Sequence, residues 1–389
     1  MPAEAAAAGA AQIGLFTPMA LRGVTLKNRI VVSPMSMYSS HDGFADDLHL
    51  VHLGRFALGG AGLVMMEATA VQRDGRITHG CNGIWQDTHV PNLRRIADFL
   101  HRFGSVAGIQ LGHSGPKGAA QRPWHGNGPL GHADAERRNE LPWQLASSSA
   151  LPFDDGWTTP RGLTGSDLDR LVLDYRSAAR RAREAGFDVI ELHCAHGYLL
   201  HAFLSPLFNR RDDAYGGSLD NRMRLPLRVA EAVRAEMADA QPLFVRISAV
   251  DGVGVGWSIE DSVVFAKALA ARGVDAIACS TGGAKLPRGQ VLPSRDPGFQ
   301  VPFAARIRQA SGVPTIAVGL ILAPQQAEAV LHAGDADLVA LGREMLFNPN
   351  WSAQAALALP GGGGWSAWPE QYAWWLERRA RHLPPRGAP

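Results

Sequence analysis

The segment Asp188-Val-Ile-Glu-Leu-His-Cys-Ala-His-Gly-Tyr198 decides the fold of this chain. Three of the four residues after Asp188 are apolar, which is typical of a short buried strand in a parallel sheet. His193, His196 and Tyr198 stand at the carboxyl end of this strand, where α/β barrels usually place their chemistry. Two imidazoles and a phenol in this position could hold a substrate oxygen and give up a proton.

Two simpler interpretations of these residues stay open at this point. The spacing His193-x-x-His196-x-x-x-x-His201 suits a metal site in part, because histidine is the commonest transition-metal ligand. No carboxylate or fourth ligand stands at the usual helical spacing, which argues against a metal. The histidines could also be packing residues, so the rest of the chain has to decide.

Length and composition exclude several classes of protein. The chain has 389 residues, of which 46% are hydrophobic and 19% are charged, and its net charge is +2. This is an ordinary globular mixture without the charge excess that nucleic acids or anionic membranes attract. The three cysteines are far apart, so we expect no disulfide framework and a cytoplasmic location. Residues 1–14 are expected to form a loose tail rather than a signal peptide, and no apolar run is long enough to cross a membrane.

Short apolar runs alternate with helical patterns along most of the chain, which predicts βαβ units and a parallel sheet. The predicted strands are 30–33, 62–66, 106–110, 189–193, 243–247, 276–279, 315–317 and 338–341. The predicted helices are 48–58, 91–102, 166–185, 219–237, 259–272, 302–310 and 324–333, with a helix-like stretch at 199–204. Eight strand–helix units predict a single α/β domain, a (β/α)8 TIM barrel over residues 15–348. A doubly wound sheet is the alternative, but no GxGxxG motif follows the first strand.

Two segments interrupt this alternation. Residues 112–165, after the third strand, are rich in Gly, Pro, His, Ser and Trp and show no period. We interpret them as a long insertion that partly covers the catalytic mouth, although a surface excursion would look the same. Residues 349–389 form a C-terminal aromatic extension, which we expect to contact another subunit or to pack on the barrel.

Polar motifs follow the predicted strands in a fixed order. They are Asn28-Arg-Ile-Val-Val-Ser-Pro-Met-Ser-Met-Tyr-Ser39, Glu67-Ala-Thr69, Ile109-Gln-Leu-Gly-His113, the segment 188–198, Leu204-Ser-Pro-Leu-Phe-Asn-Arg210, Asp213-Ala-Tyr-Gly-Gly-Ser-Leu-Asp-Asn-Arg222, Val245-Arg-Ile-Ser248, Ala317-Val-Gly-Leu320 and Leu341-Gly-Arg-Glu344. As an ordered set, these motifs resemble the Old Yellow Enzyme family of FMN-dependent ene-reductases. The form Ser-Pro-Met-x-Met-Tyr and the compact length resemble its bacterial, thermophilic-like class.

The resemblance implies a non-covalent FMN site, and each matched residue suits it chemically. Gly342 and Arg343, with a backbone donor from Gly319, would hold the phosphate, since a guanidinium fork matches phosphate oxygens. Gln110 would pair with the flavin pyrimidine edge, and Arg246 would place positive charge where negative charge collects on reduction. A structural role for Arg246 would need a carboxylate partner that the sequence does not identify. The residues matched to the wall and polar edge of the ring are Ser33, Pro34, Met35, Ser36 and Ala68.

The resemblance also implies a reaction. His193 and His196 would hydrogen-bond the oxygen of an activated alkene such as an enone while hydride passes from flavin N5 to the double bond. Tyr198 would donate the proton, and NADPH or NADH would reduce the flavin in a separate, ping-pong half-reaction. Tyr38 is expected to form a wall of the substrate pocket.

Three departures from the family pattern stand out. Ser36 replaces a typical Cys near the reactive edge of the flavin, which predicts a changed reduction potential with activity retained. Pro116 replaces the Arg of a His-x-Gly-Arg-Lys motif, so any role of that guanidinium is lost. Trp374 is our candidate for the residue that, in this class, reaches into a neighbouring active site, and we expect a homodimer or a higher homo-oligomer.

Other functions remain open on the sequence alone. The same flavin site could reduce nitroesters, nitroaromatics or dienoyl thioesters, and a barrel could also bind flavin without catalysis. The iron–sulfur version of a dienoyl reductase is disfavoured, because the cysteines are not clustered.

Overall fold

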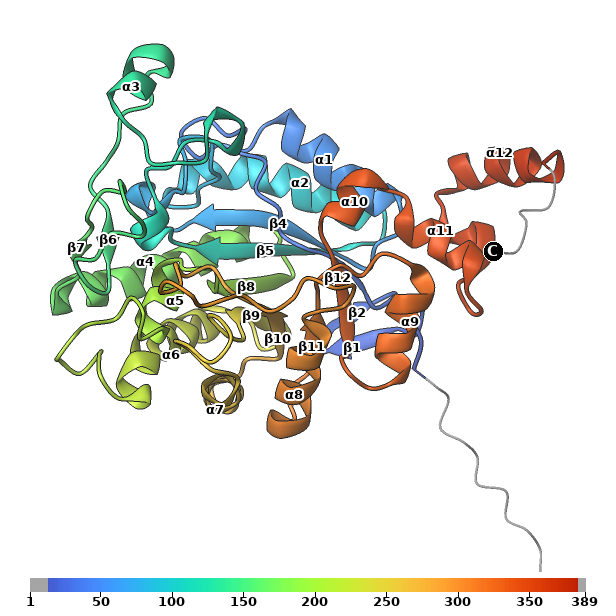
Figure 1. The fold of residues 1–389 in the computed structure, drawn as a ribbon. Helices are drawn as coiled ribbons and strands as arrows, with labels where there is room; N and C mark the ends of the chain where they lie inside the picture. Colours follow the sequence, from blue (N-terminus) through green and yellow to red (C-terminus); the bar gives the residue numbers. More distant parts are fainter. Residues whose placement is uncertain (1–12, 384–389) are drawn as a thin grey trace, which may run out of the picture.

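The computed structural model describes residues 13–383 and contains a closed barrel of eight parallel strands. Figure 1 shows these strands surrounded by helices. In barrel order the strands are β3 (Ile30–Val32), β4 (Leu63–Ala70), β5 (Val106–Gly112), β8 (Val189–Cys194), β9 (Leu243–Ser248), β10 (Ala276–Ser280), β11 (Thr315–Ala317) and β12 (Leu338–Leu341). Because β12 pairs with β3, the sheet closes, and the prediction of a (β/α)8 barrel over a doubly wound sheet is confirmed.

The predicted helices are all present, with ends that differ by a few residues at most. They are α1 (Asp47–Leu58), α2 (Val90–Arg102), α4 (Gly165–Glu184), α6 (Leu219–Glu236), α7 (Ile259–Ala270), α8 (Val301–Ser311) and α9 (Pro324–His332), with the short α5 (Leu199–Leu204) after β8. The predicted start of α4 at residue 166 is one residue late, because Thr164 accepts the backbone N–H of Asp167 and caps the helix there.

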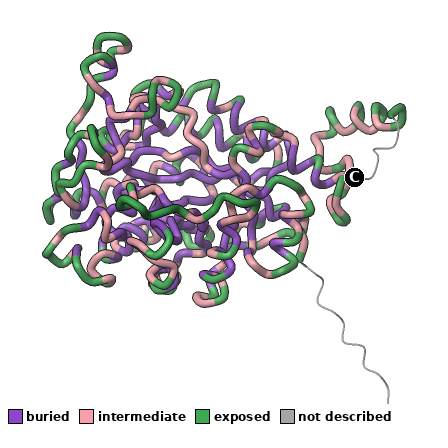
Figure 2. The backbone as a smooth tube through the Cα atoms, in the orientation of Figure 1, coloured by how far each residue is buried: buried purple, intermediate pink, exposed green. Residues whose placement is uncertain are grey.

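The barrel interior is apolar at one end and polar at the other. Inward-facing residues such as Val189 and Phe244 pack with Leu21 and Leu26 of the hairpin β1 (Met19–Leu21) and β2 (Val24–Leu26), which covers that end. In Figure 2, which has the orientation of Figure 1, the chain through the centre of the molecule is mostly buried. Because side chains alternate along a strand, the inward positions that follow Val189 on β8 are Glu191 and His193. The sheet therefore carries polar side chains toward its carboxyl ends.

The segment predicted as an insertion has short elements of its own. It contains η3 (Gly115–Lys117), η4 (Pro123–His125), α3 (His132–Arg138), β6 (Ala146–Ser147) and β7 (Arg161–Gly162). In Figure 1, α3, β6 and β7 lie beyond the arrowheads of β4 and β5. The insertion therefore stands at the end of the barrel where the polar motifs gather.

The C-terminal extension leaves the barrel. After α10 (Arg343–Phe347) and α11 (Trp351–Ala358), η5 (Gly364–Ala367) leads into α12 (Glu370–Arg381), which projects away from the strands (Figure 1). No residue of α12 is buried. Within residues 13–383, none of the helices is long and apolar enough to cross a membrane. Most of the predicted N-terminal tail, residues 1–12, lies outside the described residues.

Candidate active site

The three residues singled out at the end of β8 meet at one place. His193 Nε2 lies 3.4 Å from His196 Nδ1, and the ring centroids of His193 and Tyr198 are 4.9 Å apart. The N–H of Ala195 donates to His193 Nδ1, so the neutral ring carries its proton on Nε2. His196 Nε2 lies 2.7 Å from the hydroxyl of Ser280, which can donate to it and leave the proton on Nδ1. With these tautomers both nitrogens at the 3.4 Å contact carry a proton, so neither ring accepts from the other and both can donate to a shared acceptor oxygen.

Burial fixes the protonation of these groups. Burial, followed by the nearby charge of Arg246, holds the pKa of both His193 and His196 well below the ordinary value. Burial also raises the pKa of Tyr198 well above the ordinary value of a phenol. At neutral pH the imidazoles are therefore uncharged donors and the phenol keeps its proton.

Lys117 of the insertion reaches this group of residues. Its Nζ donates to the backbone oxygens of His196 (2.8 Å) and Gly283 (3.2 Å) and lies 5.3 Å from the centre of the Tyr198 ring. The structure thus places a partly buried cation beside the phenol.

A cavity of about 600 Å³ opens beside the histidines at the ends of β3, β9, β10, β11 and β12. Its volume is in the range of small-molecule sites. Eight of the ten predicted cofactor residues line it: Ser33, Pro34, Met35, Ser36, Arg246, Gly319, Gly342 and Arg343. Arg343 has no ion-pair partner within residues 13–383, so the simple alternative of a surface ion pair finds no support there.

The other two predicted cofactor residues lie next to this cavity rather than on its wall. Ala68 lines a small cavity that it shares with His193 and Tyr198. Gln110 stands opposite Ala68 in the β4–β5 register, and its Nε2 donates to Glu191 Oε1 at 2.7 Å. The amide nitrogen of Gln110 is thus already engaged by a carboxylate.

Glu191 is a buried carboxylate whose charge acts on Arg246, although the two side chains form neither an ion pair nor a hydrogen bond within residues 13–383. It is buried beneath His193 on β8, and its charge partly offsets the effect of burial, which lowers the pKa of Arg246. Arg246 Nε and Ser33 Oγ, both at the cavity, are nevertheless buried without a hydrogen-bond partner within residues 13–383. Unpaired buried donors of this kind are costly, so they indicate that the site receives a polar, electron-rich ligand.

Tyr38 lies between the cavity and the insertion. Its backbone is left-handed (φ +53°), its carbonyl accepts the Nε–H of Arg122, and its ring meets Trp124 edge-on at 6.3 Å. Burial, and after it the charge of Tyr38, raise the pKa of Tyr198. The predicted wall position of Tyr38 is compatible with this arrangement.

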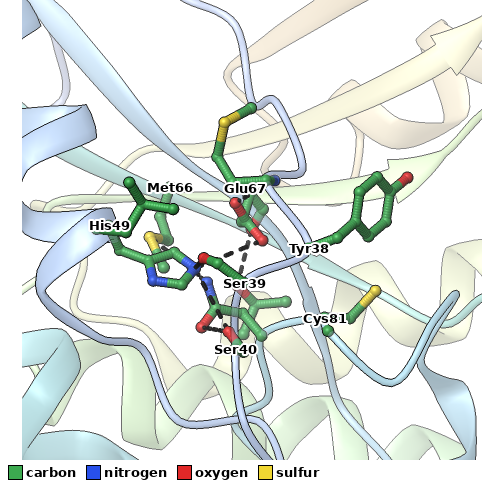
Figure 3. A network of polar contacts seen from close by, with 12 residues as sticks. Tyr38, Ser39, Ser40, His49, Met66, Glu67 and Cys81 are labelled. Atoms are coloured by element: carbon green, nitrogen blue, oxygen red, sulfur yellow. Dashed lines mark hydrogen bonds and ion pairs between the residues drawn. The ribbon is translucent and has the colours of Figure 1, made fainter. Parts of the chain in front are cut away.

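A buried polar network anchors the chain on either side of Tyr38. Figure 3 shows Ser39, Ser40, His49 and Glu67 gathered in it, with Tyr38 to one side. The N–H of Met37 donates to Glu67 Oε2 at 2.8 Å, and His49 Nε2 lies 3.3 Å from Ser39 Oγ and 3.8 Å from Glu67 Oε1. This network connects α1 and β4 to the segment that leads from Ser36 to Tyr38.

Trp374 is not brought to the site of its own chain. It lies on α12, is 48% exposed, and stacks edge-on with Trp375 at 4.4 Å. A contribution of Trp374 to catalysis would therefore have to come from another copy of the chain.

Sequence reasoning missed four polar residues that the structure brings to the site: Glu191, Ser248, Ser280 and Lys117. The first three stand on strands that were predicted or directly at their ends, so inward alternation could have found them. Lys117 is the last residue of the His-x-Gly-Arg-Lys motif in which Pro116 replaces Arg, so its match to the family pattern was the signal that could have found it. For the metal alternative, the described part of the chain holds no group of three or more His, Cys, Asp or Glu side chains placed around a common centre.

The comparisons with known proteins agree with this geometry. Residues 14–361 match the model of the NADH:flavin oxidoreductase / NADH oxidase family. The NADPH dehydrogenase of Listeria innocua is 46% identical over 347 residues, which are 89% of this chain and 95% of that protein. The NADPH dehydrogenase of Geobacillus thermodenitrificans is 45% identical over 347 residues, 89% of this chain and 94% of that protein.

Solved structures of the same type superpose over nearly the whole barrel. A morphinone reductase matches with a TM-score of 0.73 at 28% identity, covering 90% of each chain. The Old Yellow Enzyme homologue of Zymomonas mobilis matches with a TM-score of 0.70 at 26% identity, covering 86% of this chain and 90% of the other.

The chain belongs to the NADH:flavin oxidoreductase family, the family of Old Yellow Enzyme. It is an NAD(P)H-dependent flavin oxidoreductase with FMN as its cofactor. The residues present fit that cofactor, because the cavity is large enough and offers the unpaired donors of Arg246 and Ser33.

Proposed function

We propose that this protein reduces the C=C bond of activated alkenes such as enones. The observation that carries the proposal is the convergence of His193 Nε2 and His196 Nδ1, 3.4 Å apart, beside a protonated Tyr198. A binding protein would have no need for two donors and a proton source at one place. The site therefore suits a substrate with one oxygen to be held and one carbon to be protonated.

Each side chain at the site has a separate role in this reaction. When bound, FMN would supply the hydride chemistry of the site, with NADPH or NADH as its reductant. His193 and His196 donate to the substrate oxygen, which polarises the alkene and stabilises the negative charge that develops there. Tyr198 gives its proton to the α-carbon, and its high pKa keeps that proton in place until the carbon becomes basic.

The cofactor contacts are part of the same proposal. Arg246 and Ser33 offer their unpaired donors to the flavin, and Gly319, Gly342 and Arg343 hold its phosphate. Gln110 presents its amide oxygen, since its nitrogen is held by Glu191. Pro34, Met35, Ser36 and Ala68 form the wall and edge of the ring site, and Tyr38 bounds the substrate.

The two half-reactions test the proposal separately. Anaerobic holoenzyme should be bleached by NADPH and recover its absorbance when 2-cyclohexenone is added. Tyr198→Phe should slow the recovery by about 10²- to 10⁴-fold, the usual contribution of a general acid, while reduction by NADPH stays near the wild-type rate. A wild-type enzyme that several enones and maleimides fail to reoxidise would end the proposal.

A nitroaromatic oxidant separates the alternative reaction from this one. Reduction at a nitro group needs no proton on an α-carbon, so Tyr198→Phe should leave it largely unchanged. If the variant lost nitro reduction and enone reduction equally, Tyr198 would have a role other than proton donation.

We also propose that the protein forms a homo-oligomer in which α12 of one chain supplies Trp374 to the site of another. The support is an aromatic helix without any buried residue, on which Tyr372, Trp374 and Trp375 are 46%, 48% and 68% exposed. Such a surface is typical of an interface. Trp374→Ala should raise the KM for a bulky enone without changing the oligomeric state; a monomeric wild-type protein in solution would contradict the idea.

A further inference from the structure

The turn that follows β8 adopts a backbone conformation that needs support. His196 has a φ of +62° and Gly197 a φ of +77°. Left-handed backbone is unfavourable for a residue with a Cβ, so His196 keeps it only where its surroundings enforce it. A Cβ on Gly197 would stand 2.3 Å from the carbonyl oxygen of Gly283, so the turn also passes close to the loop after β10.

Side chains hold the backbone of this turn from several sides. The N–H of His196 donates to Ser248 Oγ at 2.9 Å, and its carbonyl accepts from Lys117 Nζ at 2.8 Å. The N–H of Gly197, between the two residues that face the substrate, donates to Nδ1 of His201 at 2.8 Å. His201 is the one of these three supports that is itself directed by a buried carboxylate.

We propose that His201 and Asp251 form a positioning pair for the active-site turn: Asp251 fixes the imidazole tautomer whose Nδ1 accepts the Gly197 N–H, and this bond sets the directions of His196 and Tyr198. The inference rests on the proposed function of those two residues. Neither His201 nor Asp251 is assigned to contact substrate or cofactor.

The geometry of the pair determines the tautomer. Because Nδ1 accepts a hydrogen bond, the neutral ring carries its proton on Nε2, which lies 3.2 Å from Asp251 Oδ1. This contact is close but lies outside hydrogen-bond geometry, and neither atom has a hydrogen-bond partner elsewhere in residues 13–383, so each is the nearest polar group available to the other. Both side chains are completely buried, so water does not compete for these contacts. The other carboxylate oxygen, Oδ2, accepts the N–H of Trp257 at 2.8 Å and the hydroxyl of Ser205. Asp251 therefore has one oxygen directed to the imidazole.

The charge of Asp251 is maintained in this environment. Burial alone would raise the pKa of Asp251, but the facing His201 and the hydrogen bonds from Ser205 and Trp257 lower it below its ordinary value. An ionised carboxylate only accepts, which makes the proton on Nε2 the favoured arrangement.

The most informative variant is Asp251→Asn, because it changes the tautomer and little else. The amide oxygen would take over the bonds from Trp257 and Ser205, so the amide nitrogen would face His201 Nε2. The ring would then move its proton to Nδ1, opposite the Gly197 N–H, and the bond to the turn would be lost. An Asp-to-Asn change beside a catalytic histidine acts through the tautomer in the same way.

The experiment compares holoenzyme variants with two readouts of turn geometry. One is the rate constant of anaerobic flavin reoxidation by 2-cyclohexenone. The other is the dissociation constant of a para-substituted phenol, whose anion presents one oxygen to the two imidazoles and perturbs the flavin spectrum. We expect Asp251→Asn to lower the rate by about 10- to 100-fold, as for other residues that orient a functional imidazole, and to weaken phenol binding, with FMN affinity unchanged.

Two substitutions of His201 keep the test decisive if Asp251→Asn folds poorly. His201→Leu removes both bonds, whereas His201→Gln retains an acceptor and a donor and should recover part of the lost rate. The double variant Asp251→Asn/His201→Leu should be no slower than His201→Leu, because the two residues act as a unit.

Ser262→Ala is the matched control. Ser262 is buried, and its hydroxyl accepts from Trp257 Nε1 and donates to the Ala249 carbonyl, but it does not touch the turn. The variant Ser262→Ala should lower thermal stability and leave the reoxidation rate and the phenol dissociation constant unchanged. The inference is overturned if Asp251→Asn and His201→Leu behave like Ser262→Ala, or if their effects multiply in the double variant. Failure of the wild-type enzyme to reduce any alkene would instead refute the proposed function, and phenol binding would still report on the pair.

Discussion

Lys117 is predicted to make alkene reduction depend on pH near 8. Burial lowers the pKa of its ammonium to about 8. The pKa values of His193 and His196 lie well below this range and that of Tyr198 well above it, so these groups do not change protonation there. As the pH rises through 8, Lys117 loses its positive charge, while the other three residues keep their protonation states.

The size of the effect follows from the position of Lys117. When Tyr198 gives up its proton, negative charge develops on its ring and oxygen. A cation 5.3 Å from the ring centre attracts a full charge by roughly 3 kcal/mol at an effective dielectric constant of about 20. If about half of the charge has developed in the transition state, about 1.5 kcal/mol remains, which is roughly a 10-fold change in rate.

The assay is anaerobic reoxidation of the reduced holoenzyme by 2-cyclohexenone between pH 6.5 and 9.5. The wild-type rate should fall about 10-fold around pH 8, since the protonated form of Lys117 is the active one. The reoxidation rate of Lys117→Met should be low and independent of pH over this range. The rate of Lys117→Arg should be high and independent of pH, because the charge of arginine persists. Lys285→Met, which removes an exposed lysine paired with Asp154 and Asp155, is the control and should keep the wild-type profile. If Lys117→Met still shows the fall in rate near pH 8 that the wild type shows, the reasoning is refuted.

Three further predictions concern the cofactor contacts and the polar network beside Tyr38. Arg246→Met should raise the dissociation constant of FMN at least about 10-fold, as expected for a lost charged hydrogen bond, and should leave Glu191 buried without its cation; fluorescence titration with an unchanged constant would contradict this. Ser36→Cys should shift the flavin midpoint potential and the order of preferred substrates, and identical values would show that this position is neutral. Glu67→Ala should leave the N–H of Met37 without its acceptor, raise the KM for enones and lower the unfolding temperature by at least about 2 °C. A thermal scan and a KM that both match the wild type would count against the network of Figure 3.

The barrel could be predicted from the sequence because its strands are short, apolar and buried on both faces. Such runs between helical patterns require little beyond hydrophobic periodicity to identify. The residues at their carboxyl ends could be grouped for the same reason, since parallel strands bring those ends to one side. This is why His193, Arg246 and Gly342, far apart in the chain, were expected at one site and lie around one region.

The contacts that orient these residues could not be predicted in this way. The bond from Lys117 to the His196 carbonyl depends on the path of an aperiodic insertion, and the partner of His201 depends on the loop after β9. The pairing of Gln110 with Glu191 depends on the register of β5 and β8 and on the rotamers of both residues. Periodicity states which face a side chain occupies, but it contains no information on which neighbour it meets.

The charges around the active site explain why its two histidines must be neutral. Arg246 and Lys117 place two positive charges there, whereas Glu191 supplies one negative charge that acts on Arg246. Protonating His193 or His196 would add a third positive charge against the single carboxylate of Glu191, and each of the two cations indeed lowers the pKa of both rings. The same excess of positive charge stabilises the negative charge of the bound cofactor and the negative charge that develops on the substrate oxygen. The cations thus keep the imidazoles as neutral donors and stabilise the charge that those donors receive, so removing either cation should weaken oxygen binding and hydride acceptance together.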